Sequence, residues 1–313
     1  MDFGRTLDPG PRTPDHSPLL ERLAAGDVLL CDGGMGTELQ RTAGHFECPE
    51  ELNLRNPAAV EAAHRAYFDA GSDLVETNTF GGTRARLHLH GLADQVRELS
   101  LLGAQIARSA CPQGKFVLGS IGPTGEMLEP YGDAEPEMLF DMFAEQAEAL
   151  ARGGVDALIV ETMMDAEEAR LAVRAAKEHT NLPVIATMTF AVSPAGIRTR
   201  WGVTIPSAVE TLTDAGADVI GSNCGDGFDE MIAVIEELRP RTKLPIIAQA
   251  NAGVPEMVDG VAVYRETPED ILPKASRLLE IGVNILGGCC GTRPAHIAAM
   301  RRLLNDKRTN AKR

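Results

Sequence analysis

The stretch DALIVETMMDAEEARLAVRAAKEH, residues 156–179, joins two patterns that together form one structural unit. Its first part is a short apolar run that ends in polar residues, which is typical of a strand buried on both faces of a parallel sheet. Its second part, residues 165–179, repeats apolar residues at helical spacing. We therefore predict a buried strand followed by an amphipathic helix.

The same kind of apolar run recurs along the chain. Each run is short, rich in Val, Ile and Leu, and ends in polar or glycine residues. Together with residues 156–163 the set comprises VLLCDGG (28–34), DLVETNTF (73–80), KFVLGSIGP (115–123), LPVIATMTF (182–190), DVIGSNCG (218–225), LPIIAQANAG (244–253) and NILGGCCG (284–291). This pattern predicts eight parallel strands.

Amphipathic helical patterns lie between the runs, for example at residues 57–71, 135–154 and 267–282. Four of the joints before a strand share a glycine, which suits the left-handed turn that ends a helix; they are Gly71, Gly154, Gly216 and Gly282. Eight strand–helix units predict an α/β fold of the (β/α)8 TIM-barrel type. An open, doubly wound sheet is the alternative.

We expect a single domain, with the barrel over residues 21–306. A flexible tail is expected at residues 1–20, which are rich in Pro, Gly and Asp, and a basic tail at residues 307–313. The longest irregular stretch is expected at residues 36–56, on the face that carries the catalytic loops.

The charge balance narrows the class of protein. The 313 residues include 30 Lys and Arg against 45 Asp and Glu, which gives a formal net charge of −15. A surface this negative disfavours nucleic acid and anionic membranes as partners. No apolar run approaches the ~20 residues of a membrane span, and the N-terminus lacks the apolar segment of a secretory signal. The sequence therefore predicts a cytoplasmic enzyme.

The expected carboxyl ends of the strands are unusually polar, and barrel enzymes place their sites at these ends. In chain order they are Asp32-Gly33-Gly34, Glu76-Thr77-Asn78, Gly122-Pro123-Thr124, Glu161-Thr162, Thr189, Asn223-Cys224, Asn251 and Cys289-Cys290. Buried polar groups cost free energy unless they have partners, so their clustering indicates a functional site.

Three of the six cysteines fall at these ends. Cys224 ends the sixth strand, and Cys289 and Cys290 end the eighth, so a closed barrel would bring them together. Three thiolates with one open position are the ligand set of a catalytic zinc site. We expect the flanking glycines Gly287, Gly288 and Gly291 to permit the backbone dihedrals this requires. A vicinal disulfide or a glycine-rich phosphate loop at GGCCG is the alternative.

At these residues the sequence resembles the homocysteine S-methyltransferase family, which includes betaine–homocysteine methyltransferase and the homocysteine module of cobalamin-dependent methionine synthase. The resemblance runs from about residue 26 to residue 305. Its motifs are CDGGMGTELQ (31–40), LVETNTFGG (74–82), GSIGPTG (119–125), LIVETMMD (158–165), GSNCG (221–225) and GGCCGTRPAHI (287–297).

The resemblance implies roles for individual residues. It implies that Cys224, Cys289 and Cys290 hold one Zn²⁺ per chain and carry the catalytic centre. It further implies that Asp32 and Glu161 bind the homocysteine amino group. Substrate-binding residues also implied are Gly33 and Gly34, whose amides would face the carboxylate, and Asn78 and Asn223 near the pocket. Zinc deprotonates a bound thiol, which would prepare the sulfur for methylation to methionine.

The methyl donor is less tightly defined. A quaternary ammonium donor needs an aromatic cage, whereas the chain has one Trp and three Tyr, and Thr162 stands where the betaine enzymes have tyrosine. ETMMDAEEA and ETNTF resemble the methionine synthase module. We therefore favour a methylated corrinoid, carried by a separate protein or free. Betaine or S-methylmethionine as donor, and selenocysteine as acceptor, are alternatives.

Two functions from other classes are alternatives to a homocysteine methyltransferase. A Schiff-base aldolase needs a lysine near the rim of the barrel, but Lys115 and Lys243 lie at the starts of strands. A barrel that acts only as a subunit of a corrinoid methyl-transfer complex would keep the zinc site without catalysing the reaction alone.

Overall fold

The computed structural model describes residues 17–258 and 261–310. Eight parallel strands form one sheet in the order β1-β12-β9-β8-β5-β4-β3-β2. From β2 to β12 each strand of this sheet pairs with the next one along the chain, and β12 also pairs with β1. The strands are β1 (Leu29–Leu30), β2 (Leu74–Glu76), β3 (Phe116–Ile121), β4 (Ala157–Met163), β5 (Val184–Met188), β8 (Val219–Cys224), β9 (Ile246–Ala250) and β12 (Ile285–Gly288). All eight predicted strands are confirmed.

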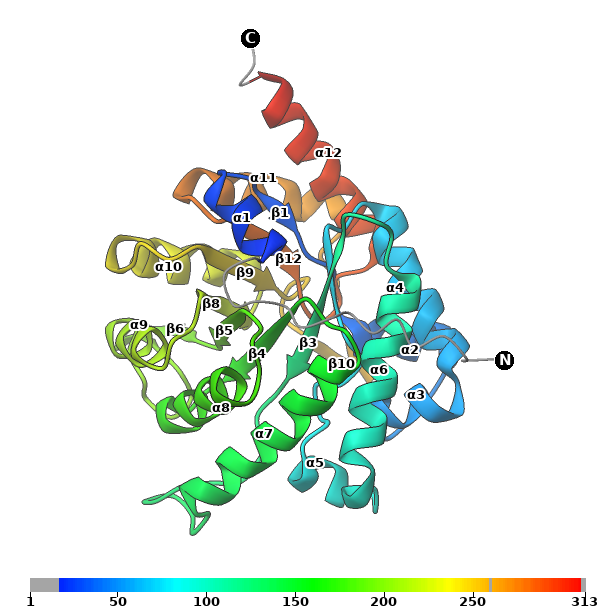
Figure 1. The fold of residues 1–313 in the computed structure, drawn as a ribbon. Coiled ribbons are helices and arrows are strands. Elements are labelled where there is room, and N and C mark those ends of the chain that lie inside the picture. The colour runs from blue at the N-terminus through cyan, green and yellow to red at the C-terminus, as the bar shows by residue number, and fades with distance from the viewer. Residues whose placement is uncertain (1–16, 259–260, 311–313) are drawn as a thin grey trace.

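One long helix follows each strand, and these helices surround the sheet (Figure 1). They are α4 (Pro57–Ala70), α6 (Val96–Ala110), α7 (Pro136–Arg152), α8 (Ala166–His179), α9 (Ile205–Asp214), α10 (Phe228–Leu238), α11 (Pro268–Ile281) and α12 (Pro294–Asn310). The fold is therefore the predicted α/β barrel and not an open, doubly wound sheet. Within the described ranges no helix has the length and apolar character needed to cross a membrane.

The barrel closes where its first and second strands meet. The Asp73 amide donates to the Leu30 carbonyl at 2.6 Å, and the Asp73 carboxylate accepts from the Leu30 amide at 3.0 Å. Further along the same seam, the Asp32 carboxylate accepts from the Glu76 amide at 3.0 Å. Two aspartates thus supply side-chain hydrogen bonds between β1 and β2, the strands at the two ends of the sheet order.

Two apolar layers hold the fold together. Alternate strand residues such as Leu74, Ile159 and Ile285 fill the interior of the barrel, and α1 (Pro18–Ala24) adds Leu19 and Leu23 to the same cluster. Burial of one such leucine contributes about 1.5–3 kcal/mol. The remaining strand residues pack against the surrounding helices in a second, larger cluster.

The structure differs from the expected outline in several segments. Residues 36–56 are not irregular, because they include α2 (Met35–Ala43), a 3₁₀ turn (Pro49–Glu51) and α3 (Leu52–Arg55). The predicted tail 1–20 overlaps α1, and the predicted tail 307–313 overlaps α12; residues 1–16 and 311–313 lie outside the described residues.

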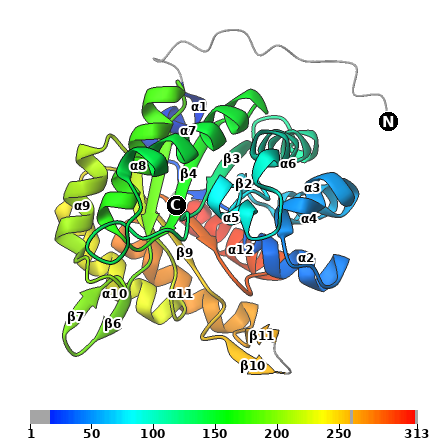
Figure 2. The same ribbon diagram turned by 90° about the horizontal axis from the view of Figure 1, so that it is seen from below.

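Short elements also decorate the loops. They are α5 (Arg84–His88), 3₁₀ turns at Ala93–Gln95 and Arg239–Arg241, and two hairpins, β6 (Ala191–Ser193) with β7 (Gly196–Arg198) and β10 (Glu256–Val258) with β11 (Val261–Val263). The sequence analysis did not foresee the hairpins, which project from the barrel on one side in Figure 2.

The closure at Asp73 yields a test of stability. Its carboxylate also binds Lys115 at 2.7 Å and forms an ion pair with Arg301. Burial alone would raise the pKa of Asp73, but these partners hold it below its usual 3.8. We expect Asp73→Asn to lower the free energy of unfolding by about 3 kcal/mol at pH 7, measured by urea denaturation.

The pH dependence and a control sharpen this test. Because the folded pKa of Asp73 is depressed, its contribution is present above pH 4 and is lost as pH falls through the folded pKa, so wild type and variant should converge in acid. Glu61→Ala, which breaks an exposed ion pair with Arg65 on α4, should cost under about 1 kcal/mol. Equal losses in both variants would contradict the role given to Asp73.

Candidate metal and substrate centre

Three cysteine sulfurs converge at the carboxyl end of the barrel. Cys224 is the last residue of β8, and Cys289 and Cys290 follow β12 directly. The Sγ atoms of Cys224 and Cys289 lie 2.9 Å apart, and all three sulfurs lie within 4.8 Å of one another. The three cysteines are free thiols, and the two non-adjacent segments meet as the sequence predicts.

The backbone leaves strand geometry to bring the sulfurs together. Cys224 has φ 61°, in the left-handed region that residues with a side chain seldom adopt. Gly225, directly after Cys224, has φ 71°, and Gly291, directly after Cys290, has φ 78°. A strained residue at such a position is a common mark of a functional site.

Gly287 and Gly288 are needed for a different reason than the one predicted. Neither has a positive φ in the structure. A Cβ on Gly288 would lie 2.2 Å from the Thr292 side chain, and one on Gly287 would lie 2.9 Å from Cβ of Cys31. These glycines therefore provide space, while Gly291 provides the turn.

The turn after β1 packs closely against the turn after β12. A Cβ on Gly33 would lie 2.3 Å from the Thr292 carbonyl oxygen, and one on Gly34 would lie 2.7 Å from the Cys289 carbonyl oxygen. The buried Tyr67 hydroxyl donates to the Thr292 carbonyl at 2.9 Å. The Gly34 amide is already used, because it donates to the same carbonyl at 3.1 Å.

Three carboxyl groups gather inside the barrel mouth, and one of them, Glu76, was placed at a strand end by the sequence analysis but was given no role. Burial raises the pKa of Asp32 to about 8, with a smaller contribution from the charge on Glu161. Burial and the charges on Glu161 and Asp32 raise the pKa of Glu76 well above its usual value. Burial also raises the pKa of Glu161. Among the described residues no Lys or Arg forms an ion pair with any of the three.

The partners of Glu76 explain why it escaped attention. It ends β2 in the motif ETNTF, and only the folded barrel brings it to Gln249 of β9, whose amide donates to its carboxylate at 2.7 Å. The thiol of Cys31 also faces it at 4.0 Å. The signal available in the sequence was its place at a strand end, which it shares with Asp32 and Glu161.

Asn223 ties the carboxyl group of Glu161 to the cysteine strand. Its amide nitrogen donates to Glu161 at 3.0 Å and to the Thr162 hydroxyl at 2.7 Å. Its amide oxygen accepts from the Thr162 amide at 2.9 Å and from the Thr187 hydroxyl at 2.8 Å. These bonds stabilise Thr162 at φ 62°, and Ser120 adds a bond to Glu161 at 2.6 Å.

Asn78 has its hydrogen bonds elsewhere. Its amide nitrogen donates to the Pro49 carbonyl at 2.7 Å and to the Asn53 side chain at 3.0 Å. Asn53 in turn donates to the Asn78 carbonyl at 2.8 Å. These contacts place Asn78 as a support for the segment around α3, and its predicted contact with a substrate stays a prediction.

Two buried oxygens on β9 and the loop after it have no hydrogen-bond partner in the described chain. They are Oε1 of Gln249 and Oδ1 of Asn251. Asn251 donates through its nitrogen to the Gly225 carbonyl at 2.6 Å, beside Cys224. Acceptor oxygens without donors, next to three thiols and three carboxyl groups, fit a centre that receives cationic groups such as a metal ion and an ammonium.

Comparison with known proteins agrees with this geometry. The sequence model of one family, described as homocysteine S-methyltransferase, matches residues 29–304. The chain belongs to the homocysteine S-methyltransferase family. It is 36% identical over 289 residues to methionine synthase of Mycobacterium tuberculosis, and 36% identical over 298 residues to methionine synthase of Mycobacterium leprae.

The homocysteine S-methyltransferase fold also appears among solved structures. The metallated form of the homocysteine methyltransferase MmuM from Escherichia coli is 25% identical and gives a TM-score of 0.75, with 91% of this chain and 99% of that chain covered. The alignments with the two mycobacterial methionine synthases cover 86% and 89% of this chain but only 24% of each synthase. The chain therefore spans about a quarter of the length of these two relatives. Family, fold class and methyltransferase class are thereby confirmed.

The contact between the two turns can be tested with a pair of glycines. A methyl group on Gly34 would meet Cys289 and Cys290 backbone atoms at 2.7 and 3.0 Å. We expect Gly34→Ala to lower the free energy of unfolding by about 1–3 kcal/mol, measured by urea denaturation. Gly36→Ala, two residues on in α2 with nothing within 4 Å of its added methyl group, should be neutral or stabilising by up to about 1 kcal/mol.

Proposed function

We propose that this chain is a zinc-dependent homocysteine S-methyltransferase that forms methionine. The observation that carries the proposal is the convergence of Cys224, Cys289 and Cys290 beside a buried group of carboxyls that has no cationic partner in the described chain. The first feature suits a metal that can accept a thiol, and the second suits an ammonium. Homocysteine carries both groups.

Zinc suits the sulfur ligands best. Three cysteine ligands that leave a fourth coordination position open match catalytic rather than structural zinc sites. Bound zinc would deprotonate the homocysteine thiol and keep its sulfur nucleophilic. Cys224, Cys289 and Cys290 would hold one ion per chain.

The residues around the sulfurs would orient the amino acid. Asp32 and Glu161 would bind its ammonium, and we add Glu76 to this pair because the three carboxyl groups are coupled by their charges. The substrate carboxylate would lie at the start of α2, where no side chain caps the helix and the Gly33 amide is close. Asn223 would hold Glu161 in place through its hydrogen bonds.

The methyl group would move by in-line displacement. The new bond joins the homocysteine sulfur to the methyl carbon, and the bond between that carbon and the donor breaks. We favour a methylated corrinoid as donor, on a separate protein or free. The 36% identity to two methionine synthases supports a corrinoid, because the sequence motifs resemble the homocysteine module of cobalamin-dependent methionine synthase.

A donor screen tests the function. Zinc-loaded protein should methylate homocysteine with methylcobalamin, and the product methionine can be measured by mass spectrometry. Cys224→Ser, Cys289→Ser and Cys290→Ser should each lose zinc, measured by elemental analysis, and reduce turnover at least about 100-fold. Cys111→Ser, a free thiol at the end of α6, is the matched control and should keep both.

The outcomes separate the alternatives. Turnover with betaine or S-methylmethionine but not with methylcobalamin would identify that compound as the donor. A faster reaction with selenocysteine than with homocysteine would identify selenocysteine as the acceptor. Zinc binding without turnover on any donor would favour a subunit of a larger complex. Full activity after any of the three substitutions at the sulfur centre would remove the proposal.

The raised pKa of Asp32 predicts a pH dependence of substrate binding. Because its pKa is about 8, Asp32 is mostly protonated at pH 7, and an ammonium that binds its carboxylate must displace the proton. Affinity should therefore rise between pH 6 and 8, with proton release. Norleucine, which has no thiol, isolates this effect from proton release at the metal.

Calorimetry in buffers of different ionisation enthalpy measures that proton count. Asp32→Asn and Glu76→Gln should release fewer protons and bind norleucine about tenfold more weakly. Glu145→Gln on α7, which removes a carboxylate paired with Arg84 of α5, should match wild type. An unchanged proton count in Asp32→Asn would rule out its role.

A further inference from the structure

Strand β5 supplies none of the residues proposed to bind zinc or homocysteine, yet it separates two strands that do. In the sheet order it lies between β4, which carries Glu161, and β8, which ends in Cys224. The strands β4 and β8 do not pair with each other, because β5 pairs with both. The direct path from the Glu161 carboxyl group to the sulfur centre therefore crosses β5.

Two threonines at and just after the end of β5 hold Asn223. The Thr187 hydroxyl donates to Oδ1 of Asn223 at 2.8 Å, and the Thr189 hydroxyl donates to the main-chain carbonyl of Asn223 at 3.0 Å. The two threonines are two residues apart, a spacing that places side chains on the same face of an extended chain. One threonine thus fixes the side chain of Asn223, and the other fixes its main chain directly before Cys224.

The backbone of β4 is distorted where it meets Asn223. Its register with β5 shifts between Val160 and Met163, and Thr162 within that interval has φ 62°. A bulge of this kind redirects a neighbouring side chain, but a left-handed backbone is unfavourable for a β-branched residue. Asn223 stabilises it through bonds to the amide and the hydroxyl of Thr162 at 2.9 and 2.7 Å. The distortion beside Glu161 therefore depends on a side chain that β5 holds.

The amide group of Asn223 uses its full hydrogen-bonding capacity in this network. Its oxygen accepts from Thr187 and Thr162, and its nitrogen donates to Thr162 and to Glu161. We propose that Thr187 and Thr189 are positioning residues, which set the separation between the Glu161 carboxyl group and the Cys224 sulfur by fixing Asn223 between them. This inference rests on the proposed function, since the separation matters for a molecule that binds at both ends.

Valine in place of Thr187 keeps the shape of the side chain and removes its hydroxyl donor. Zinc-loaded Thr187→Val should bind homocysteine about tenfold more weakly, because the two ends of the ligand no longer meet a fixed spacing. Its affinities for zinc and for norleucine should stay within about twofold of wild type, since each involves one end alone. Thr187→Ser, which keeps the donor, should restore homocysteine binding. Calorimetry measures both amino acids, and competition with a chromophoric chelator measures zinc.

The corresponding change at Thr189 should affect the metal end instead. Thr189→Val frees the Asn223 carbonyl beside Cys224, so the affinity for zinc should fall about tenfold. The affinity for norleucine should not change, and Thr189→Ser should restore zinc binding. Wild-type zinc affinity in Thr189→Val would contradict the role given to Thr189.

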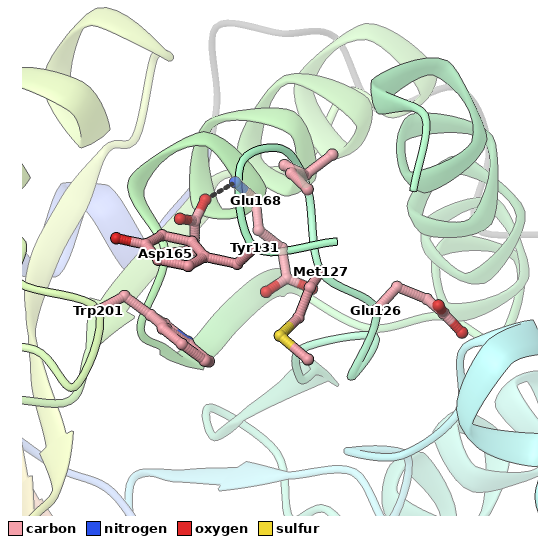
Figure 3. Close-up of a pocket in the computed structure, with 7 residues that line it drawn as sticks. Glu126, Met127, Tyr131, Asp165, Glu168 and Trp201 are labelled. Atoms are coloured by element: carbon pink, nitrogen blue, oxygen red, sulfur yellow. Dashed lines mark hydrogen bonds between the residues drawn. The ribbon is translucent and has the colours of Figure 1, made fainter. Parts of the chain in front are cut away.

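A matched control is available in a buried threonine outside this network. The Thr124 hydroxyl donates to Glu168 at 2.6 Å. Glu168 lines a hollow at the start of α8, where its amide donates to Asp165 (Figure 3). Thr124 and Thr187 are 2% and 0% exposed, so Thr124→Val removes a comparable buried hydrogen bond. It should bind zinc, norleucine and homocysteine as wild type does.

The mobility of the Asn223 side chain provides a readout that needs no substrate. In NMR relaxation measurements its amide group should be rigid in wild type, Thr187→Ser and Thr124→Val, and mobile in Thr187→Val. A rigid amide in Thr187→Val, or equal losses of homocysteine and norleucine affinity there, would overturn the positioning role. If the wild-type protein did not bind homocysteine, the proposed function would fail, and the relaxation data would still show whether β5 fixes Asn223.

Discussion

The centre depends on close contact between the turn after β1 and the turn after β12. The first and last strands pair side by side, and the Gly288 amide donates to the Asp32 carbonyl at 2.8 Å. This contact is tight enough that Gly33 and Gly34 have no space for a side chain. A looser contact between these two turns would separate the carboxyl group of Asp32 from the sulfurs of Cys289 and Cys290. Asp32 takes part in both contacts of β1, because its carbonyl accepts from Gly288 of β12 and its carboxylate accepts from the Glu76 amide of β2.

The buried carboxyl groups and unpartnered oxygens at the barrel mouth lower the stability of the folded chain when nothing is bound there. Burial raises the pKa values of Asp32, Glu76 and Glu161 together, and the oxygens of Gln249 and Asn251 have no partner in the described chain. A chain selected only for stability would pair or replace such groups. The hydrogen bonds of Asn223 limit the cost, since they satisfy its own amide and support Thr162 in its strained conformation.

Local patterns made the barrel and the sulfur centre predictable from sequence, whereas contacts between distant segments were not. Each strand is a short apolar run, so its end and the cysteine there can be read directly. Glu76 was not recognised because its partner Gln249 lies on another strand, and the hairpin β6–β7 is exposed and carries no core pattern. The helix α2 has a glycine and two threonines, and it is stabilised by packing of Leu39 near Val60 and Ala63.

The same geometry explains how the proposed centre could select one amino acid. A thiol without an amino group could reach the sulfur centre but would leave the carboxyl groups without a cationic partner. An amino acid without a thiol would satisfy the carboxyl groups and leave the sulfur centre open. Asn223 contacts Glu161 directly and precedes Cys224 in β8. It therefore holds the carboxyl group that would bind the ammonium at a fixed distance from the sulfur centre. Selectivity then follows from the requirement that one small molecule meet both demands at once.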